Sequence, residues 1–181
     1  YLEMYILADN TPDHGFFEVL KRKAREGVQV KIIIDSVGSN GLKSNTVKEV
    51  RATGAELLFF SYWLQRTHKK ILIIDEKIAF VGGVNIHKTF RKWNDLQMRV
   101  SGRIVKSFIR SFARTYAMCH GTDAHILSWD KKKTVFGKTK LWIFEHWQSD
   151  QRRQMKNQYQ ASIANALTNI TMVTPYLMPF R

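Results

Sequence analysis

Apolar and polar positions along the first sixty residues follow each other in an order that predicts a strand–helix repeat. Three apolar runs are typical of buried strands, at residues 1–7, 28–35 and 55–60. Between them, apolar residues recur at helical spacing from Thr11, an N-cap candidate, to Gly27, and again over residues 45–53. Strands separated by helices indicate an α/β fold. We therefore expect a mixed, mostly parallel β-sheet flanked by helices on both faces.

A hairpin is predicted next, with its polar groups confined to the turn and the open end. Residues 68–74 and 78–85 form two apolar runs, and Asp75, Glu76 and Lys77 make a polar turn between them. This pattern is unusual for a buried hairpin, because the other polar side chains stand only where the two runs diverge.

The turn sets which residues of the hairpin face each other. If it centres on Glu76–Lys77, Lys70 lies opposite Gly83 and His68 lies opposite Asn85. Strand alternation then places these side chains on one face of the sheet, and Gly83 removes a side chain that would crowd them. The apolar part would hold the hairpin in place, while its open end presents an imidazole, an amine and an amide together.

The rest of the chain carries weaker patterns. Strands are predicted at 96–100 and 141–147, helices at 104–120 and 152–168, and a basic, loop-like connection over 121–140. The last apolar segment, residues 169–179, resembles the first, since Tyr176 and Tyr5 are each followed by apolar residues. We expect residues 1–130 to form one half, and residues 131–181 to hold the basic connection and the start of a second, truncated half.

Composition and charge narrow the class of partner. A chain of 181 residues with 44% hydrophobic residues can form one domain with a core. Its net charge of +14 favours phospholipid head groups, phosphodiesters or nucleic acid over a merely soluble basic surface. The single cysteine, Cys119, excludes a disulfide within the chain. No apolar run approaches the ~20 residues of a membrane span. The chain starts and stops inside predicted strands, so we expect a piece of a longer protein.

The polar groups at the open end of the hairpin suit phosphoryl transfer. Lys70 offers a positive charge and Asn85 offers N–H donors to a phosphate oxygen. His68, with an ordinary pKa near ~6.5, can be neutral at pH 7 and act as a nucleophile. A histidine alone is more often structural, and it is the combination with Lys70, Asp75 and Asn85 that favours a site.

The spacing of these residues resembles the motif of the phospholipase D superfamily. That motif is H-x-K, four residues, Asp, six residues and Gly-Gly-x-Asn, and it is matched by His68, Lys70, Asp75, Gly82, Gly83 and Asn85. Many members have Ser where this chain has Gly83. The Gly-Gly form, together with the segments YLEMYIL, GVQVKIIIDSVGS, WNDLQMRVSG and VTPYLMP in the same order, is similar to the cardiolipin synthase branch.

The resemblance implies an enzyme, a phosphatidyltransferase or phosphodiesterase that uses a phosphohistidine intermediate and needs no metal or other cofactor. One histidine attacks phosphorus, and a second histidine from a paired half protonates the leaving alcohol. Water or another alcohol then resolves the intermediate. In cardiolipin synthases that acceptor is an alcohol group of phosphatidylglycerol.

The same resemblance assigns roles by position. His68 becomes the nucleophile or its acid partner, and Lys70 and Asn85 bind phosphate. Asp75 is implied to hold the geometry of the motif, and Asp95 to orient the catalytic histidine.

Other acidic residues and a group of Cys and His residues are further candidates for a site. Glu3 stands in an apolar strand and is either paired or at a site; the resemblance favours the active-site end, so we expect it to contact substrate with Lys70, Gly83 and Asn85. Asp35 ends a strand where α/β proteins place ligands, although aspartate there is often a turn or cap residue. A zinc site is not expected, because the spacing of Cys119, His120 and His125 fits no strong zinc pattern.

One motif is half of what such an enzyme needs. A second motif half is therefore an expected partner, from the same full-length chain or from a homodimer, and the chain alone is expected to be inactive or weakly active. The resemblance also implies anionic phospholipid and a membrane surface as partners, with Tyr62 and Trp63 as candidates for a lipid-facing mouth. The expected location is the bacterial cytoplasmic membrane, peripheral or anchored by segments outside this chain.

Two other functions stay open from the sequence. A nuclease or phosphodiesterase of the same superfamily would use the same residues on nucleic acid, which a chain of charge +14 would bind. A degenerate half could serve only as a scaffold or dimerisation module, although the intact motif argues against it.

Overall fold

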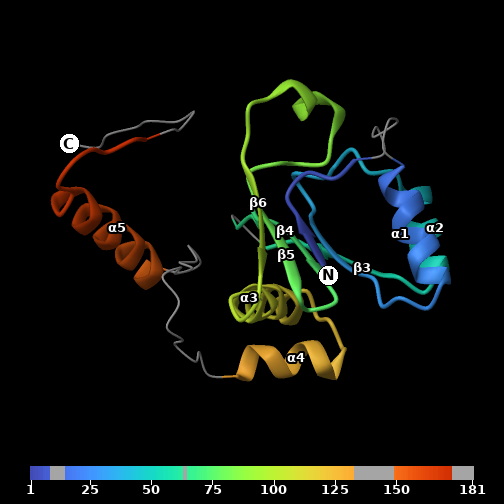
Figure 1. Cartoon of the computed structure of the whole chain (residues 1–181). Helices are drawn as coiled ribbons and strands as arrows, with labels where there is room; N and C mark the ends of the chain where they lie inside the picture. The colour runs from blue at the N-terminus through green and yellow to red at the C-terminus, as the bar shows by residue number, and fades with distance from the viewer. Residues whose placement is uncertain (9–14, 63–64, 133–148, 173–181) are drawn as a thin grey trace. The chain divides into compact units, whose positions relative to one another are not determined.

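The computed structural model describes residues 1–8, 15–62, 65–132 and 149–172 of the chain. It divides into two compact units, Tyr1–Leu141 and Trp142–Arg181. The first unit contains a mixed sheet of six strands with helices packed on it, which confirms the predicted α/β class. Figure 1 shows this unit with its sheet at the centre and the helices around it.

Sheet topology places the first strand in the middle of the sheet, beside the motif strand. The strand order is β3-β2-β1-β4-β5-β6, in which β1, β2 and β3 are parallel and β4, β5 and β6 are antiparallel to their neighbours. The bounds are Leu2–Met4 for β1, Lys31–Asp35 for β2, Glu56–Phe60 for β3, Lys70–Ile74 for β4, Ile78–Gly82 for β5 and Gln97–Ser101 for β6. Because β1 pairs with both β2 and β4, the carboxyl end of β1 lies beside the start of the motif strand β4.

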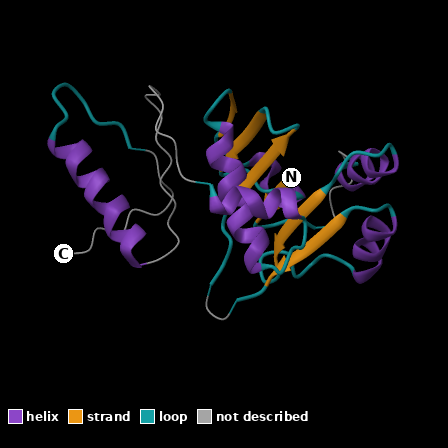
Figure 2. Ribbon diagram, turned by 90° about the horizontal axis from the view of Figure 1, so that it is seen from below, coloured by secondary structure: helices purple, strands orange, loops and turns teal. Residues whose placement is uncertain are grey.

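Helices cover the two faces of the sheet as the sequence predicts. α1 (Phe16–Arg25) and α2 (Ser44–Ala52) bury a core that includes Leu2, Ile32 and Leu57. α3 (Val105–Met118) packs on the opposite face, where Phe108, Phe112 and Tyr116 are buried at every fourth position. Figure 2 shows α1 and α2 on one side of the sheet and α3 on the other.

The predicted hairpin forms, but the predicted register is wrong by one residue. Ile74 pairs with Ile78 and Ile71 pairs with Val81, so the loop holds three residues and not two. Asp75 and Glu76 both adopt positive φ, 52° and 55°, which lets so short an odd loop close. Extended by one residue, this register places Gly82 rather than Gly83 opposite Lys70.

A short helix was missed in the segment predicted as a loop. α4 (Ala124–Lys131) begins after Asp123, whose carboxylate accepts hydrogen bonds from the backbone N–H groups of His125 and Ile126. Aspartate at this position is the signal that identifies an N-cap, and the fully buried Ile126 attaches the helix to the fold. The basic composition of the surrounding segment hid this pattern.

In the second unit the structure describes residues 149–172. α5 (Ser149–Ala164) corresponds to the helix predicted at 152–168. Residues 169–172 do not form the predicted final strand, and the rest of that strand lies outside the described residues. The predicted edge strand at 141–147 and the helix start at Thr11 also lie outside them. The division into a first half and the start of a second half stays a prediction.

Candidate active site

Alternation along residues 67–70 sends successive side chains of the motif to opposite faces of the sheet. Lys70 pairs with Met4 and therefore shares the face that carries the α1 and α2 core. Lys69 contacts α3 on the other face. The sequence therefore builds two environments on one short segment, one at His68 and Lys70 and one at Thr67 and Lys69.

Lys70 and His68 are in direct contact. Lys70 Nζ lies 3.0 Å from His68 Nδ1 and donates a hydrogen bond of 2.7 Å to the His68 carbonyl oxygen. The lysine is buried, whereas the histidine is exposed. An imidazole open to solvent with an ammonium group beside it is the arrangement that attack on a phosphodiester requires.

Asn85 reaches this end of the sheet by a route that the sequence did not reveal. After Gly82 the chain leaves β5 and runs alongside the continuation of β1, where Leu7 and Ile86 form a parallel bridge. There Ile6 N–H donates a hydrogen bond of 3.2 Å to Asn85 Oδ1. Asn85 is thus placed by the path of the chain, and not by the hairpin register that predicted it.

Gly83 and Asp95 occupy adjoining space beside Lys70. A Cβ added to Gly83 would lie 2.1 Å from Asp95 Oδ1, closer than any real contact, so the absent side chain makes room for this carboxylate. The N–H of Leu96 donates to the same oxygen at 2.7 Å. Any larger residue at position 83 would displace Asp95, the only acidic side chain that acts electrostatically on Lys70 among the described residues.

Burial lowers the pKa values of both motif groups. Burial lowers the pKa of Lys70 to about 8, against a raising effect from Asp95. Burial also lowers the pKa of His68, the charge of Lys70 lowers it further, and Asp35 opposes both. His68 is therefore neutral at pH 7, the form in which an imidazole can act as a nucleophile.

The opposite face of the motif segment is tied into the protein by a polar network. The hydroxyl of Thr67 donates to Glu3 Oε1, and both residues are almost fully buried. Lys69 Nζ lies 3.7 Å from the same carboxylate and donates to Ser111 Oγ at 2.9 Å and Thr115 Oγ1 at 3.1 Å. Glu3 thus lies on the face of the sheet opposite Lys70. It belongs to the buried polar network and is not one of the groups that the motif presents to solvent.

Asp35 makes a second attachment to the residue before His68. Its buried carboxylate accepts hydrogen bonds from the backbone N–H groups of Val37 and Gly38, and from that of Thr67 at 2.9 Å. The carboxyl end of β2 is therefore connected to the start of the motif by one side chain. The sequence left Asp35 open between a turn role and a ligand role, and its three backbone donors give it the former.

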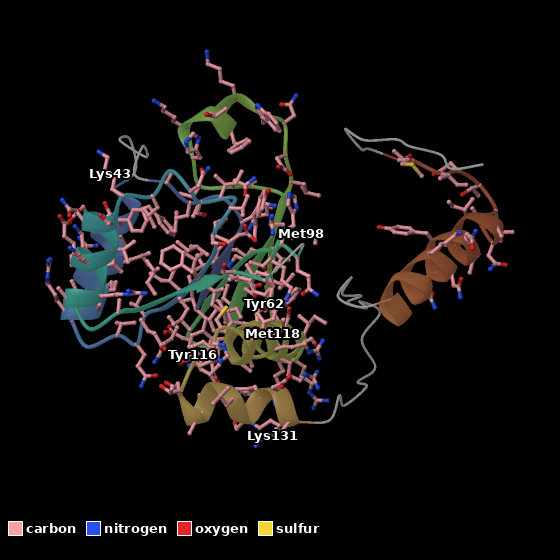
Figure 3. The ribbon with its side chains drawn as sticks, turned by 180° about the vertical axis from the view of Figure 1, so that it is seen from behind. Lys43, Tyr62, Met98, Tyr116, Met118 and Lys131 are labelled. Carbon is pink, nitrogen blue, oxygen red and sulfur yellow. The ribbon has the colours of Figure 1, made fainter. Side chains whose placement is uncertain are left out.

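Of the other predicted residues, Asp75 lies away from this cluster. Asp75 is exposed in the hairpin turn, at the end of β4 remote from His68. Tyr62 donates a hydrogen bond of 3.2 Å to the carbonyl oxygen of Met118 at the end of α3. Both residues are labelled in Figure 3. Trp63 lies outside the described residues.

In the part of the chain that the structure describes, no three His, Cys, Asp or Glu side chains are grouped as a metal site would require.

A family model described as the phospholipase D-like domain of cardiolipin synthase matches residues 1–116. These residues include all six strands and the whole cluster described above. The match therefore covers more than half of the chain.

Individual relatives agree with the family model. The chain is 28% identical to the cardiolipin synthase of Clostridium perfringens strain 13, over 99% of this chain and 42% of the relative. It is 29% identical to the major cardiolipin synthase of Bacillus subtilis, over 99% of this chain and 41% of the relative. The chain thus spans about two fifths of the length of these curated relatives.

A solved structure supports the fold alone. The phospholipase D family member Nuc of Salmonella typhimurium superposes with a TM-score of 0.52 at 20% identity, covering 64% of this chain and 76% of that one.

Each described helix of the present structure is too short or too polar to cross a membrane.

Proposed function

The chain belongs to the phospholipase D-like domain family of cardiolipin synthases, and on that premise we propose that it supplies one half of a phosphatidyl-transfer site. The observation that carries the proposal is the contact between His68 and Lys70, at 3.0 Å, at the open end of the hairpin. The relatives that cover the chain from end to end are cardiolipin synthases, so the nucleic-acid alternative is not favoured.

In the proposed reaction a ring nitrogen of neutral His68 attacks the phosphorus of phosphatidylglycerol. The bond between phosphorus and the head-group oxygen breaks, and the leaving glycerol takes a proton from an acid in a second half. A hydroxyl group of another phosphatidylglycerol then attacks the phosphohistidine and gives its proton back to that second-half group, which forms cardiolipin and restores the imidazole. Lys70 and Asn85 would offset the charge that gathers on the phosphoryl oxygens, and Asp95 would hold Lys70 charged.

A second motif half is part of the proposal, because a single half holds one histidine of the two. The sheet supports a place for it. Leu72, Ile74, Ile78 and Phe80 share the face of Lys70 by register, and all remain at least partly exposed in the described part of the chain. A second half laid on this apolar face would bury it and reach His68 at the same time.

We further propose that the site works at an anionic membrane surface, peripheral to the bilayer or anchored by other parts of the protein. Support comes from the loop between β5 and β6, which projects from the sheet in Figure 1. Trp93 and Leu96 are 58% and 70% exposed in this loop, which also carries the basic residues Lys88 and Lys92, and Met98 at the start of β6 is 48% exposed. Exposed aromatic and apolar side chains next to lysines suit the interface of an anionic bilayer.

The test uses the full-length protein that contains this chain, with vesicles of phosphatidylglycerol. Cardiolipin and glycerol should appear in equal amounts, without added metal, and neither should appear with His68→Ala. The 181-residue chain alone should give little product. Failure of the folded full-length protein to form cardiolipin would remove the proposed function.

A further inference from the structure

Tyr5 is an aromatic residue at the site that no motif position includes. Its ring centroid lies 4.3 Å from that of His68, with the two planes tilted by 44°. Lys70 Nζ stands 5.0 Å from the centre of the same ring, within the range of a cation–π contact. One side chain thus contacts both functional groups of the motif segment.

The position of Tyr5 is fixed by the loop that follows β2. Ser39 Oγ donates a hydrogen bond of 3.0 Å to the Tyr5 carbonyl oxygen and accepts one of 3.0 Å from the N–H of Leu7. A Cβ on Gly38 would lie 2.4 Å from the same carbonyl oxygen and 2.7 Å from Cε2 of the ring. Only glycine at position 38 therefore allows the ring to occupy this place.

We propose that Tyr5 is a positioning residue that holds the His68 imidazole and the Lys70 amine in one arrangement and shields both from water. The role in catalysis rests on the proposed phosphatidyl transfer. The contacts of Tyr5 with the two side chains, and their effect on His68, do not depend on which reaction the site performs.

The aromatic ring acts on the two groups in different ways. Against His68 it supplies an apolar wall, which disfavours the charged imidazolium. Against Lys70 it offers a negative ring face to the ammonium group, which favours one orientation of the amine. The groups that also act on this pair are Asp35 on His68 and Asp95 on Lys70, and each raises the pKa of its neighbour. The lowered pKa of His68 agrees with the apolar contact, since burial is its largest cause.

The test compares Tyr5→Phe, which keeps the ring, with Tyr5→Leu and Tyr5→Ala, which remove it. His68 is followed in the 181-residue chain by NMR of labelled histidine, with its signal assigned from the His68→Gln variant. We expect Tyr5→Phe to leave the titration of His68 unchanged. Tyr5→Ala should raise its pKa toward the ordinary value near ~6.5 and remove the ring-current shift. Tyr5→Leu keeps apolar volume, so it should remove the ring-current shift with a smaller rise of the pKa.

Activity of the full-length protein gives an independent reading. Loss of the ring should lower kcat by about 10- to 100-fold with little change in KM, because the reacting groups lose their orientation and not their affinity. An unchanged His68 signal in both Tyr5→Leu and Tyr5→Ala would overturn the inference. A His68 signal that changes as expected in a protein that forms no cardiolipin would uphold the Tyr5 contact and overturn only the proposed reaction.

Discussion

The two faces of residues 67–70 carry side chains that are held in different ways. On one face, Thr67 and Lys69 are bound to Glu3 and to α3 by hydrogen bonds and an ion pair. On the other, His68 and Lys70 contact each other and the ring of Tyr5. The anchored face fixes the backbone, and the open face can then carry groups with lowered pKa values without loss of the fold.

The largest effect should come from removing the reactive groups of the open face. His68→Asn and Lys70→Met should each lower phosphatidyl transfer by about 10⁴-fold or more, because groups that act as a unit fail together. Unfolding by urea should show both variants folded, since His68 is exposed and Lys70 is a buried cation that an apolar side chain can replace.

Lys77→Met is the matched control for Lys70→Met. Lys77 is an exposed residue of the hairpin turn, at the closed end of the same two strands. It should keep full activity. If Lys77→Met and Lys70→Met lost equal activity, the amine of Lys70 would have no specific role in the transfer.

The next largest effect should come from Lys69→Met on the anchored face. This change removes the cation 3.7 Å from the fully buried Glu3 and leaves the hydroxyls of Ser111 and Thr115 without their shared donor. The free energy of unfolding should fall by about 3 kcal/mol. The measurement is the urea midpoint, with Lys70→Met alongside.

The two lysines are neighbours in sequence and both are shielded from solvent, so they are a matched pair. Lys69→Met should lose stability and keep most of its activity per folded molecule, whereas Lys70→Met should do the reverse. Similar stability of the two variants would contradict the division between the faces.

Thr67→Val should show a smaller effect of the same kind. Valine keeps the shape of threonine but removes the hydroxyl that donates to Glu3, while the backbone bond to Asp35 remains. A buried carboxylate that loses one donor should cost about 1–2 kcal/mol of unfolding free energy. Thr67→Ser keeps the hydroxyl and should lie closer to the parent chain in thermal unfolding; if it falls as far as Thr67→Val, the hydroxyl contact is not what stabilises this face.

The sequence predicts the regular parts of this fold because local patterns determine them. The apolar runs that became β2 and β3, and the four-residue spacing of Phe108, Phe112 and Tyr116, depend on burial that repeats along the chain. The register of the hairpin could not be read in this way, since it depends on backbone angles at Asp75 and Glu76 that their residue types rarely adopt.

For the candidate site, the motif spacing predicts which residues take part. It does not predict the contacts that bring them together. Asn85 arrives beside β1 through the bridge between Leu7 and Ile86, a contact between segments almost eighty positions apart. Tyr5 has no signal beyond being an aromatic residue in a strand, and only the fold places it on His68. Long-range contacts of this kind leave no local pattern in the sequence.

The smallest expected effect is a shift in the pH at which Lys70 loses its charge. Since burial lowers its pKa to about 8, the ammonium group is lost as pH rises through that value, and transfer should decline on the alkaline side near pH 8. Asp95 opposes the lowering, so Asp95→Asn should lower the pKa of Lys70 further and move the decline to lower pH. NMR of labelled lysine follows Lys70 itself, and kcat/KM against pH follows the reaction.

Asp75→Asn is the control for this change, because it removes the same charge at the remote hairpin turn and asparagine tolerates the positive φ found there. It should leave both the Lys70 titration and the alkaline decline in place. If Asp95→Asn also leaves them in place, the carboxylate of Asp95 does not raise the pKa of Lys70. Burial alone would then set the lowered pKa of Lys70, and the close approach of Asp95 to Gly83 would be a packing contact without an electrostatic role.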